Sequence, residues 1–241
     1  MKEMQLTNSK PTFFTAIGIV GIAAVLIGFL KTFIIPVLSG TKTWPFSIYL
    51  HASFVFCWLV IFLTQSVLIQ NHKYTTHITI GKLATIVAVG ASISIIPAAL
   101  YQCKRELGEG LGQIAISSIL GSFNSACIFL LLVAFAIGYR KKPQAHKRFM
   151  LLATIVLIWP AWFRWRHYFP TIKRPDIWFA VVLADSLIII AFIWDWLKNK
   201  SIHPSLLFAG LFIMAEHCIE IIFFDSSGWR IIANSIYNTF K

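Results

Sequence analysis

Long apolar runs, separated by short polar breaks, make up most of the sequence. Seven of these runs reach the length of about 20 residues that a transmembrane helix needs. They cover about residues 13–36, 47–70, 78–101, 111–139, 147–168, 176–197 and 203–225. Polar and apolar residues do not alternate strictly along them, which favours helices over the strands of a closed barrel. The pattern therefore predicts an all-α integral membrane bundle of seven transmembrane helices, built as a single polytopic domain over residues 1–241.

The last segment of the chain, residues 228–241, is too short to cross a membrane. Its apolar residues recur at helical spacing along one face, and they are Trp229, Ile232, Ile236, Tyr237 and Phe240. This spacing predicts a short C-terminal interfacial helix that lies on the membrane surface. An odd number of spans places the two ends of the chain on opposite sides, which we call side A (the N-terminal side) and side B.

The composition favours a membrane location. Hydrophobic residues make up 58% of the chain and charged residues only 12%, whereas a soluble domain has about 25% charged residues. The net charge of +12 comes from basic residues in the breaks between spans, where they set topology and do not form a nucleic-acid-binding surface. The densest basic cluster, residues 140–148, faces side A. We therefore expect a protein embedded in a lipid bilayer with a cytoplasmic N-terminus.

Ionisable residues inside the spans are candidates for a functional site, since they are costly in lipid and usually face the interior of a bundle. A rise of about 1.5 Å per residue places several of them roughly 6–14 Å inside side B. They form a predicted buried polar layer of His51, Arg164, Asp185, Glu216, His217 and Glu220. Two interpretations stay open, namely a functional site or ion pairing that holds the bundle together. We expect Arg164 to pair with one of the three carboxylates of this layer.

A short internal repeat singles out two histidines at the other side. His77 and His146 are each followed by five residues and then by Leu-Ala-Thr-Ile-Val. Both therefore open their spans at the same depth on side A, and we expect their rings to act together on one ligand. The basic residues around His146 would make this end of the bundle attractive to an anion such as a haem propionate or a lipid phosphate.

Four segments carry further motifs, and together they span most of the chain from 47 to 210. The segments are 50–69, 77–84, 145–154 and 194–210. Their notable positions, together with Arg164, are His51, Trp58, Gln65, His77, Gly81, His146, Arg148, Met150, Asp195, His203 and Pro204. This pattern resembles a family of bacterial polytopic membrane proteins of unknown function, although Ile78 stands where that family usually has arginine. The resemblance implies a bacterial inner membrane location and carries no established activity.

The first functional class that these features allow is a b-type haem-binding or quinone-linked redox protein. Haem in a helical bundle needs paired imidazoles from facing helices. His77 with His146 offers one such pair on side A, and His51 with His217 offers another on side B. Histidines at the ends of spans are also similar to the layout of cytochrome b561-type bundles.

Two further classes stay open. Ser47 and His51 are similar to a motif of the alkaline ceramidase and progestin-receptor-like superfamily, which would imply a metal-dependent intramembrane hydrolase with zinc on His51, His217 and a carboxylate. This chain lacks the second histidine that the superfamily has in its last span. The third class is a non-catalytic transporter, assembly factor or structural membrane subunit. The sequence leaves open which class applies, whether the chain is an enzyme, and whether haem or zinc is its cofactor.

Overall fold

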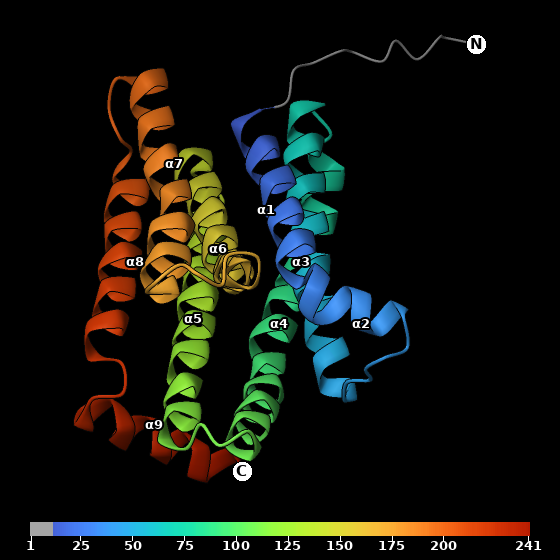
Figure 1. The fold of residues 1–241 in the computed structure, drawn as a ribbon. Helices are drawn as coiled ribbons and strands as arrows, with labels where there is room; N and C mark the ends of the chain where they lie inside the picture. Colours follow the sequence, from blue (N-terminus) through green and yellow to red (C-terminus); the bar gives the residue numbers. More distant parts are fainter. Residues whose placement is uncertain (1–11) are drawn as a thin grey trace.

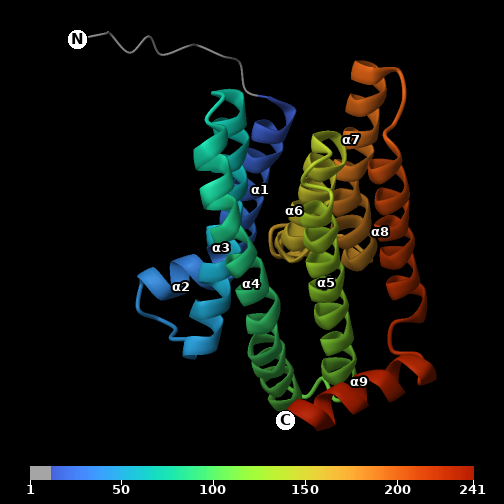
Figure 2. The same ribbon diagram turned by 180° about the vertical axis from the view of Figure 1, so that it is seen from behind.

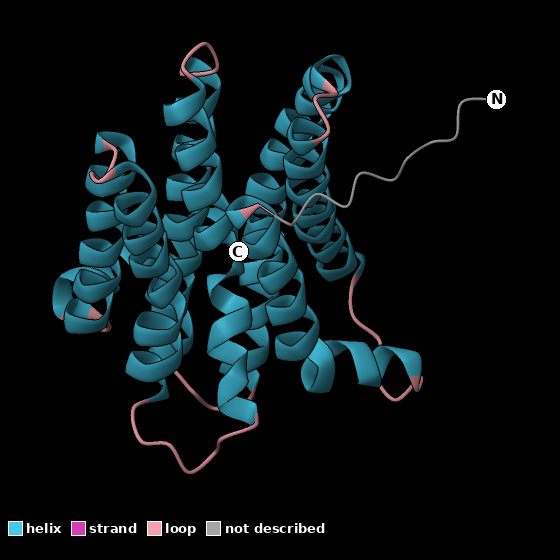
Figure 3. Ribbon diagram, turned by 90° about the horizontal axis from the view of Figure 1, so that it is seen from above, coloured by secondary structure: helices cyan, strands magenta, loops and turns pink. Residues whose placement is uncertain are grey.

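The computed structural model describes residues 12–241, and this part of the chain is folded almost entirely into helices, with no strand (Figure 3). In chain order the elements are α1 (Phe13–Phe29), η1 (Leu30–Ile34), α2 (Ile35–Leu38), α3 (Phe46–Gln70), α4 (Tyr74–Gly108), α5 (Gln113–Gly138), α6 (Pro143–Phe163), η2 (Arg164–His167), η3 (Asp176–Leu183), α7 (Ala184–Asn199), α8 (Pro204–Phe223) and α9 (Ser227–Phe240). Segments η1 and η3 are π-helical, and η2 is a 3₁₀ turn.

Seven of the helical stretches are long and apolar enough to cross a membrane, which confirms the predicted all-α bundle of seven spans. They run Phe13–Leu38, Phe46–Gln70, Tyr74–Gly108, Gln113–Gly138, Pro143–His167, Asp176–Asn199 and Pro204–Phe223. The fifth span begins before the predicted residue 147, because Pro143 is favoured in the first turn of a helix. The start of α1 and the terminal helix α9 lie at opposite ends of the bundle, as the predicted topology requires (Figures 1 and 2).

The third span, α4, is longer at both ends than the predicted 78–101. Its 35 residues give a length of about 52 Å, well beyond the roughly 30 Å of a hydrocarbon core. The polarity of residues 102–108 predicts a loop, but these residue types are mostly good helix formers. Arg105 also pairs with Glu109 one turn later at 3.3 Å. The additional turns carry α4 down to α9 (Figure 1).

The first span bends before it ends. Pro36 has no backbone N–H, and its ring crowds the carbonyl of the preceding turn, so a regular α-helix does not run straight through it. The chain widens into the π-helical segment η1 just before this proline, and α2 turns away from the bundle (Figures 1 and 3). Such a π-bulge beside a proline is a known cause of a helix bend.

Helix α6 lies at the centre of the bundle. In its most apolar stretch 61% of the residues are buried by the protein, against 22% for α3 and for α8. It packs against α1, α5, α7 and α8. Helices α1, α3 and α4 lie on one side of it, and α7 and α8 lie on the other (Figures 1 and 2). Side chains of α6 therefore contact both halves of the molecule.

The C-terminal helix α9 crosses the B end of the bundle below α4 and α5 (Figures 1 and 2). Its buried face contains Ala233, and Ile236 and Tyr237 pack against a small cluster around Cys103 and Ile119. The predicted short terminal helix is therefore present, and it docks onto protein along its length. Two residues of the predicted face differ, because Ile232 is 52% exposed and Phe240 is 46% exposed.

Candidate functional site

At the A end of the bundle the rings of His77 and His146 lie side by side. Their centroids are 6.3 Å apart, and the ring planes make an angle of 82°. His77 comes from the first turns of α4, and His146 comes from the first turns of α6. The structure thus brings together the two rings that the internal repeat singled out.

The two histidines occupy equivalent positions in their helices. Lys73 is the N-cap of α4 and Lys142 is the N-cap of α6. The backbone N–H of His77 donates to the carbonyl of Lys73 at 3.0 Å, and that of His146 donates to the carbonyl of Lys142 at the same distance. The repeat in the sequence therefore corresponds to a repeat in local structure, with a lysine cap one turn before each imidazole.

The ring nitrogens of this pair differ in what they bind. Nδ1 of His146 lies 2.8 Å from the carbonyl oxygen of Ala136, and because a carbonyl only accepts, this nitrogen carries the proton. The lone pair of His146 Nε2 is then free. Nδ1 of His77 is buried and has no hydrogen-bond partner within residues 12–241. Gln65 donates from Nε2 to the backbone carbonyl of His77 at 3.1 Å, which ties the start of α4 to α3.

The predicted polar layer is divided into two groups. Asp185, Glu216, His217 and Glu220 lie together around the contact of α7 with α8. Nδ1 of His217 lies 2.7 Å from Oδ1 of Asp185, and its Nε2 lies 3.8 Å from Oε2 of Glu216. Asp185 and His217 are only 3% and 5% exposed. The ring of Trp159 from α6 lies 6.2 Å from the imidazole and covers the group on that side.

Helix α5 completes this first group with two residues that the sequence analysis did not single out. Asn124 donates a short hydrogen bond from Nδ2 to Oε1 of Glu216. Gly121 leaves space for the carboxylate of Glu220, because a Cβ atom at this glycine would overlap Oε1. A signal for Asn124 was available, since it is an amide inside an otherwise apolar span. Nothing in the sequence points to Gly121.

The second group contains His51 and Arg164, and here the predicted ion pair is wrong. Arg164 makes no ion pair with any carboxylate that the structure describes. Its guanidinium carbon lies 4.2 Å from the centre of the Phe29 ring on α1. The physical reason is its position at the start of η2, where α6 has ended and the side chain is directed at α1, away from the carboxylates on α7 and α8.

His51 is bound within the same half of the molecule and does not meet His217. Its Nδ1 lies 3.0 Å from Oγ of Ser94 on α4, and Ser94 in turn donates to the carbonyl of Ala91 at 3.0 Å. His51 and His217, the predicted second imidazole pair, therefore have different partners, Ser94 and Asp185. Among the described residues no group of three His, Cys, Asp or Glu could hold a metal ion, so the zinc arrangement of the hydrolase class is not assembled.

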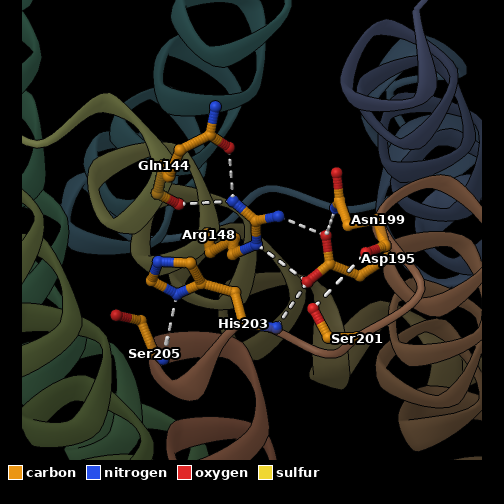
Figure 4. Close-up of polar contacts among 7 residues, drawn as sticks. All are labelled: Gln144, Arg148, Asp195, Asn199, Ser201, His203 and Ser205. Atoms are coloured by element: carbon orange, nitrogen blue, oxygen red, sulfur yellow. Dashed lines mark hydrogen bonds and ion pairs between the residues drawn. The ribbon is translucent and has the colours of Figure 1, made fainter.

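A third cluster, on side A, surrounds the buried pair of Arg148 and Asp195 (Figure 4). Arg148 donates from Nε to Oδ2 of Asp195 at 3.0 Å, and it donates a shorter bond from Nη2 to Oδ1. Its Nη1 donates to the backbone and side-chain oxygens of Gln144 at 2.7 and 2.8 Å. The same carboxylate accepts from Asn199 at 2.6 Å and from the backbone N–H of His203 at 2.8 Å. This cluster joins α6, α7 and the start of α8.

His203 also caps α8. Its Nδ1 accepts a hydrogen bond from the backbone N–H of Ser205 at 3.2 Å, so this nitrogen carries no proton. Burial lowers the pKa of His203, and the positive charge of Arg148 lowers it further. Both effects favour the neutral ring that can act as a cap.

No protein-family model matches the chain, and no curated protein or solved structure matches it either. The function therefore has to be argued from the geometry of these three clusters.

Proposed function

We propose that this chain is an integral membrane redox protein that holds a b-type haem between His77 and His146. The observation that carries the proposal is the 6.3 Å between the centroids of the two rings. Two histidines on one haem iron have their ligating nitrogens about 4 Å apart, and each nitrogen lies about 1 Å from its ring centre, so the ring centres are roughly 6 Å apart. The spacing of these two rings agrees with this value.

Three features around the rings favour coordination. The hydrogen bond from His146 to Ala136 leaves Nε2 as the free nitrogen and fixes the ring, which is the usual outer-shell arrangement of a coordinating histidine. Helix α5 packs against both α4 and α6, and it holds the two histidine-bearing helices apart. The cap residues Lys73 and Lys142 bring positive charge to the same end, where it would attract the carboxylates of a haem.

A bound haem would supply one-electron oxidation and reduction at the A end of the bundle. The chain would supply ligands and their support. His77 and His146 would bind the iron, and Gln65 would keep the first turn of α4 against α3 through its bond to the carbonyl of His77. Ala136 would keep His146 in one tautomer.

The proposal includes the surroundings of the protein. We place it in the lipid bilayer of a bacterial inner membrane, on the resemblance of its motifs to a bacterial membrane family. The basic cluster of residues 140–148 supports a cytoplasmic A end, and hence a cytoplasmic N-terminus, because positive loops stay on the inside.

Absorbance spectra of the purified protein, oxidised and reduced, together with iron analysis of the same sample, test this function. A reduced haem spectrum with one iron per chain is expected for the unchanged protein. His77→Ala and His146→Ala should each reduce the haem content, and the double substitution should abolish it. His72→Ala is the matched control, because His72 lies near the same end and its imidazole is hydrogen-bonded to Tyr74.

An unchanged spectrum and iron content in the double variant would refute haem ligation by this pair. Purified protein that contains no haem, and takes up none when haem is added, would also refute it. The second of these results would favour the alternative that the chain is a non-catalytic transporter, assembly factor or structural membrane subunit.

A further inference from the structure

In the B half of the bundle, α5 contacts α8 and the residues just after it at three levels, one above the other, and two of these contacts are hydrogen bonds. Ser117 donates from Oγ to Oδ1 of Asp225 at 2.6 Å, just after α8 has ended. One turn further into the bundle, Gly121 leaves space for the carboxylate of Glu220. The next contact joins Asn124 to Glu216. Because the helices are antiparallel, the three carboxylates form a ladder that leads inward from side B.

The inner end of the ladder is the imidazole of His217. Its Nε2 is 3.8 Å from Glu216, and its Nδ1 is 2.7 Å from Asp185, so each ring nitrogen faces a different carboxylate. An imidazole in this position can receive a proton at one nitrogen and release one from the other. The second oxygen of Asp185, Oδ2, is buried and has no hydrogen-bond partner among the described residues. The ladder therefore ends at the carboxylate of Asp185, whose Oδ2 is available to accept a hydrogen bond.

The charges within the ladder do not balance. Three carboxyl groups lie inside the spans, at Asp185, Glu216 and Glu220, and within residues 12–241 the only potential cation in ion-pair contact with them is His217. Ionised carboxylates without cationic partners are unfavourable inside a membrane protein. At least one of these groups must therefore hold a proton.

In the part of the chain that the structure describes, the neighbouring elements do not supply a cation for this group. Helix α6 contributes Trp159, and α5 contributes only the uncharged residues of the ladder. The single charged residue of η3, Asp176, is paired with Arg174. At the surface, hydrogen bonds from Arg230 and then from Ser117 lower the pKa of Asp225, which keeps this outermost carboxylate ionised.

We infer that Asp225, Glu220, Glu216, His217 and Asp185 form a proton path that connects side B with the centre of the bundle. In each step an O–H or N–H bond breaks at the donor and a new one forms at the acceptor, and no electron is transferred. Asp185 is the inner terminus, where a proton is stored. This inference concerns the B half of the molecule and does not depend on haem binding at side A.

Infrared spectroscopy of the full chain in lipid vesicles tests the path, because the carbonyl stretch of a protonated carboxyl group is resolved and shifts when its proton is replaced by deuterium. The unchanged protein should show such a band, and Asp185→Asn should remove part of it. After transfer to heavy water, Glu220→Gln should slow deuterium exchange of the remaining band about tenfold, which corresponds to roughly 1.4 kcal/mol on the slowest step.

Two further variants complete the design. Glu220→Asp keeps a carboxyl group in the ladder and should restore fast exchange. Glu106→Gln is the matched control, because Glu106 lies on α4 and bonds to Gln102, outside the ladder. Circular dichroism and thermal melting of every variant confirm that the fold is retained, and a Glu220→Gln protein that does not fold is replaced by Glu216→Gln.

The inference is overturned by the absence of a protonated carboxyl band in the unchanged protein, or by equal exchange rates in Glu220→Gln and Glu106→Gln. A band that appears only after sodium ions are removed would also overturn it, since the carboxylates would then hold a metal cation in place of protons.

Discussion

Arg148 and Asp195 form an ion pair that is buried between α6 and α7, with exposed fractions of only 2% and 0%. Both oxygens of Asp195 accept hydrogen bonds from Arg148, and they also accept from Asn199 and from the backbone of His203. The guanidinium of Arg148 therefore balances the charge of the carboxylate. The two carboxylate oxygens accept hydrogen bonds from α6, from α7 and from the loop before α8. Removing one partner of such a buried pair is costly, because the other charge is left uncompensated.

We predict that Arg148→Leu lowers the free energy of unfolding by about 3–5 kcal/mol, because it leaves the charge of Asp195 buried without a partner. Denaturant or thermal unfolding of the purified protein in detergent measures this change. Arg174→Leu is the control, because it breaks an exposed pair with Asp176 and should leave unfolding almost unchanged. A similar loss of stability in both variants would contradict the special role of the buried pair.

The cap formed by His203 predicts a dependence of stability on pH. Because its pKa is lowered in the folded protein, the unfolded chain binds this proton more readily. The contribution of His203 to stability is therefore complete above the ordinary pKa of about 6.5 and is lost as the pH falls from there toward the lowered folded value.

The substitution His203→Asn keeps a side chain that can cap a helix and removes the titration, so its stability should depend less on pH below about 6.5 than that of the unchanged protein. His203→Ala removes the cap and should cost about 1 kcal/mol at neutral pH. Unfolding curves measured at a series of pH values decide the matter. Parallel pH profiles of the unchanged and His203→Asn proteins would argue against this cap as a titrating group.

The number, type and order of the spans could be predicted from the sequence, because only helices and closed barrels satisfy the backbone in lipid and long apolar runs without alternation form helices. The end of α4 could not, because the polarity of residues 102–108 suggests a loop while their helix propensity continues the span. The contact between His77 and His146 could be predicted from their sequence repeat, since equal positions on two helices imply equal depth.

The partners of the buried polar residues were harder to predict from the sequence. Depth along a helix can be counted from the sequence, but the direction of a side chain around the bundle cannot. Arg164 has nearly the same predicted depth as Glu220, yet one faces α1 and the other faces α5. The place of Gly121 beside a carboxylate is a property of the packed structure alone.

The surroundings of Arg164 give a third prediction. Since its guanidinium lies over Phe29 and pairs with no carboxylate of residues 12–241, Arg164→Met leaves no described carboxylate without a partner. We expect the free energy of unfolding to fall by no more than about 1–2 kcal/mol, the range of a cation–π contact. Phe29→Leu, which removes the ring from the other side, should have an effect of similar size. A loss of about 3–5 kcal/mol in Arg164→Met would indicate a buried ion pair after all.

The last prediction concerns α9, which packs mainly against α5 at the B end. Its removal exposes the small cluster around Cys103 and Ile119, and it breaks the 2.9 Å hydrogen bond from Nε1 of Trp229 to the carbonyl of Ser117. It leaves intact the contacts of α6 with α1, α5, α7 and α8 that hold the spans together. A chain that ends at Ser226 should therefore insert with all seven spans and melt at a lower temperature.

Tag accessibility on both sides of the membrane and thermal melting of the purified protein measure the two parts of this prediction. Trp229→Phe separates the hydrogen bond from the packing and should cost about 1 kcal/mol, because the carbonyl of Ser117 loses its donor while the ring remains. Ile232→Ala is the matched control, since the side chain of Ile232 is half exposed. If the shortened chain failed to insert, α9 would be required for assembly of the spans, and its description as a helix docked onto a complete bundle would have to be given up.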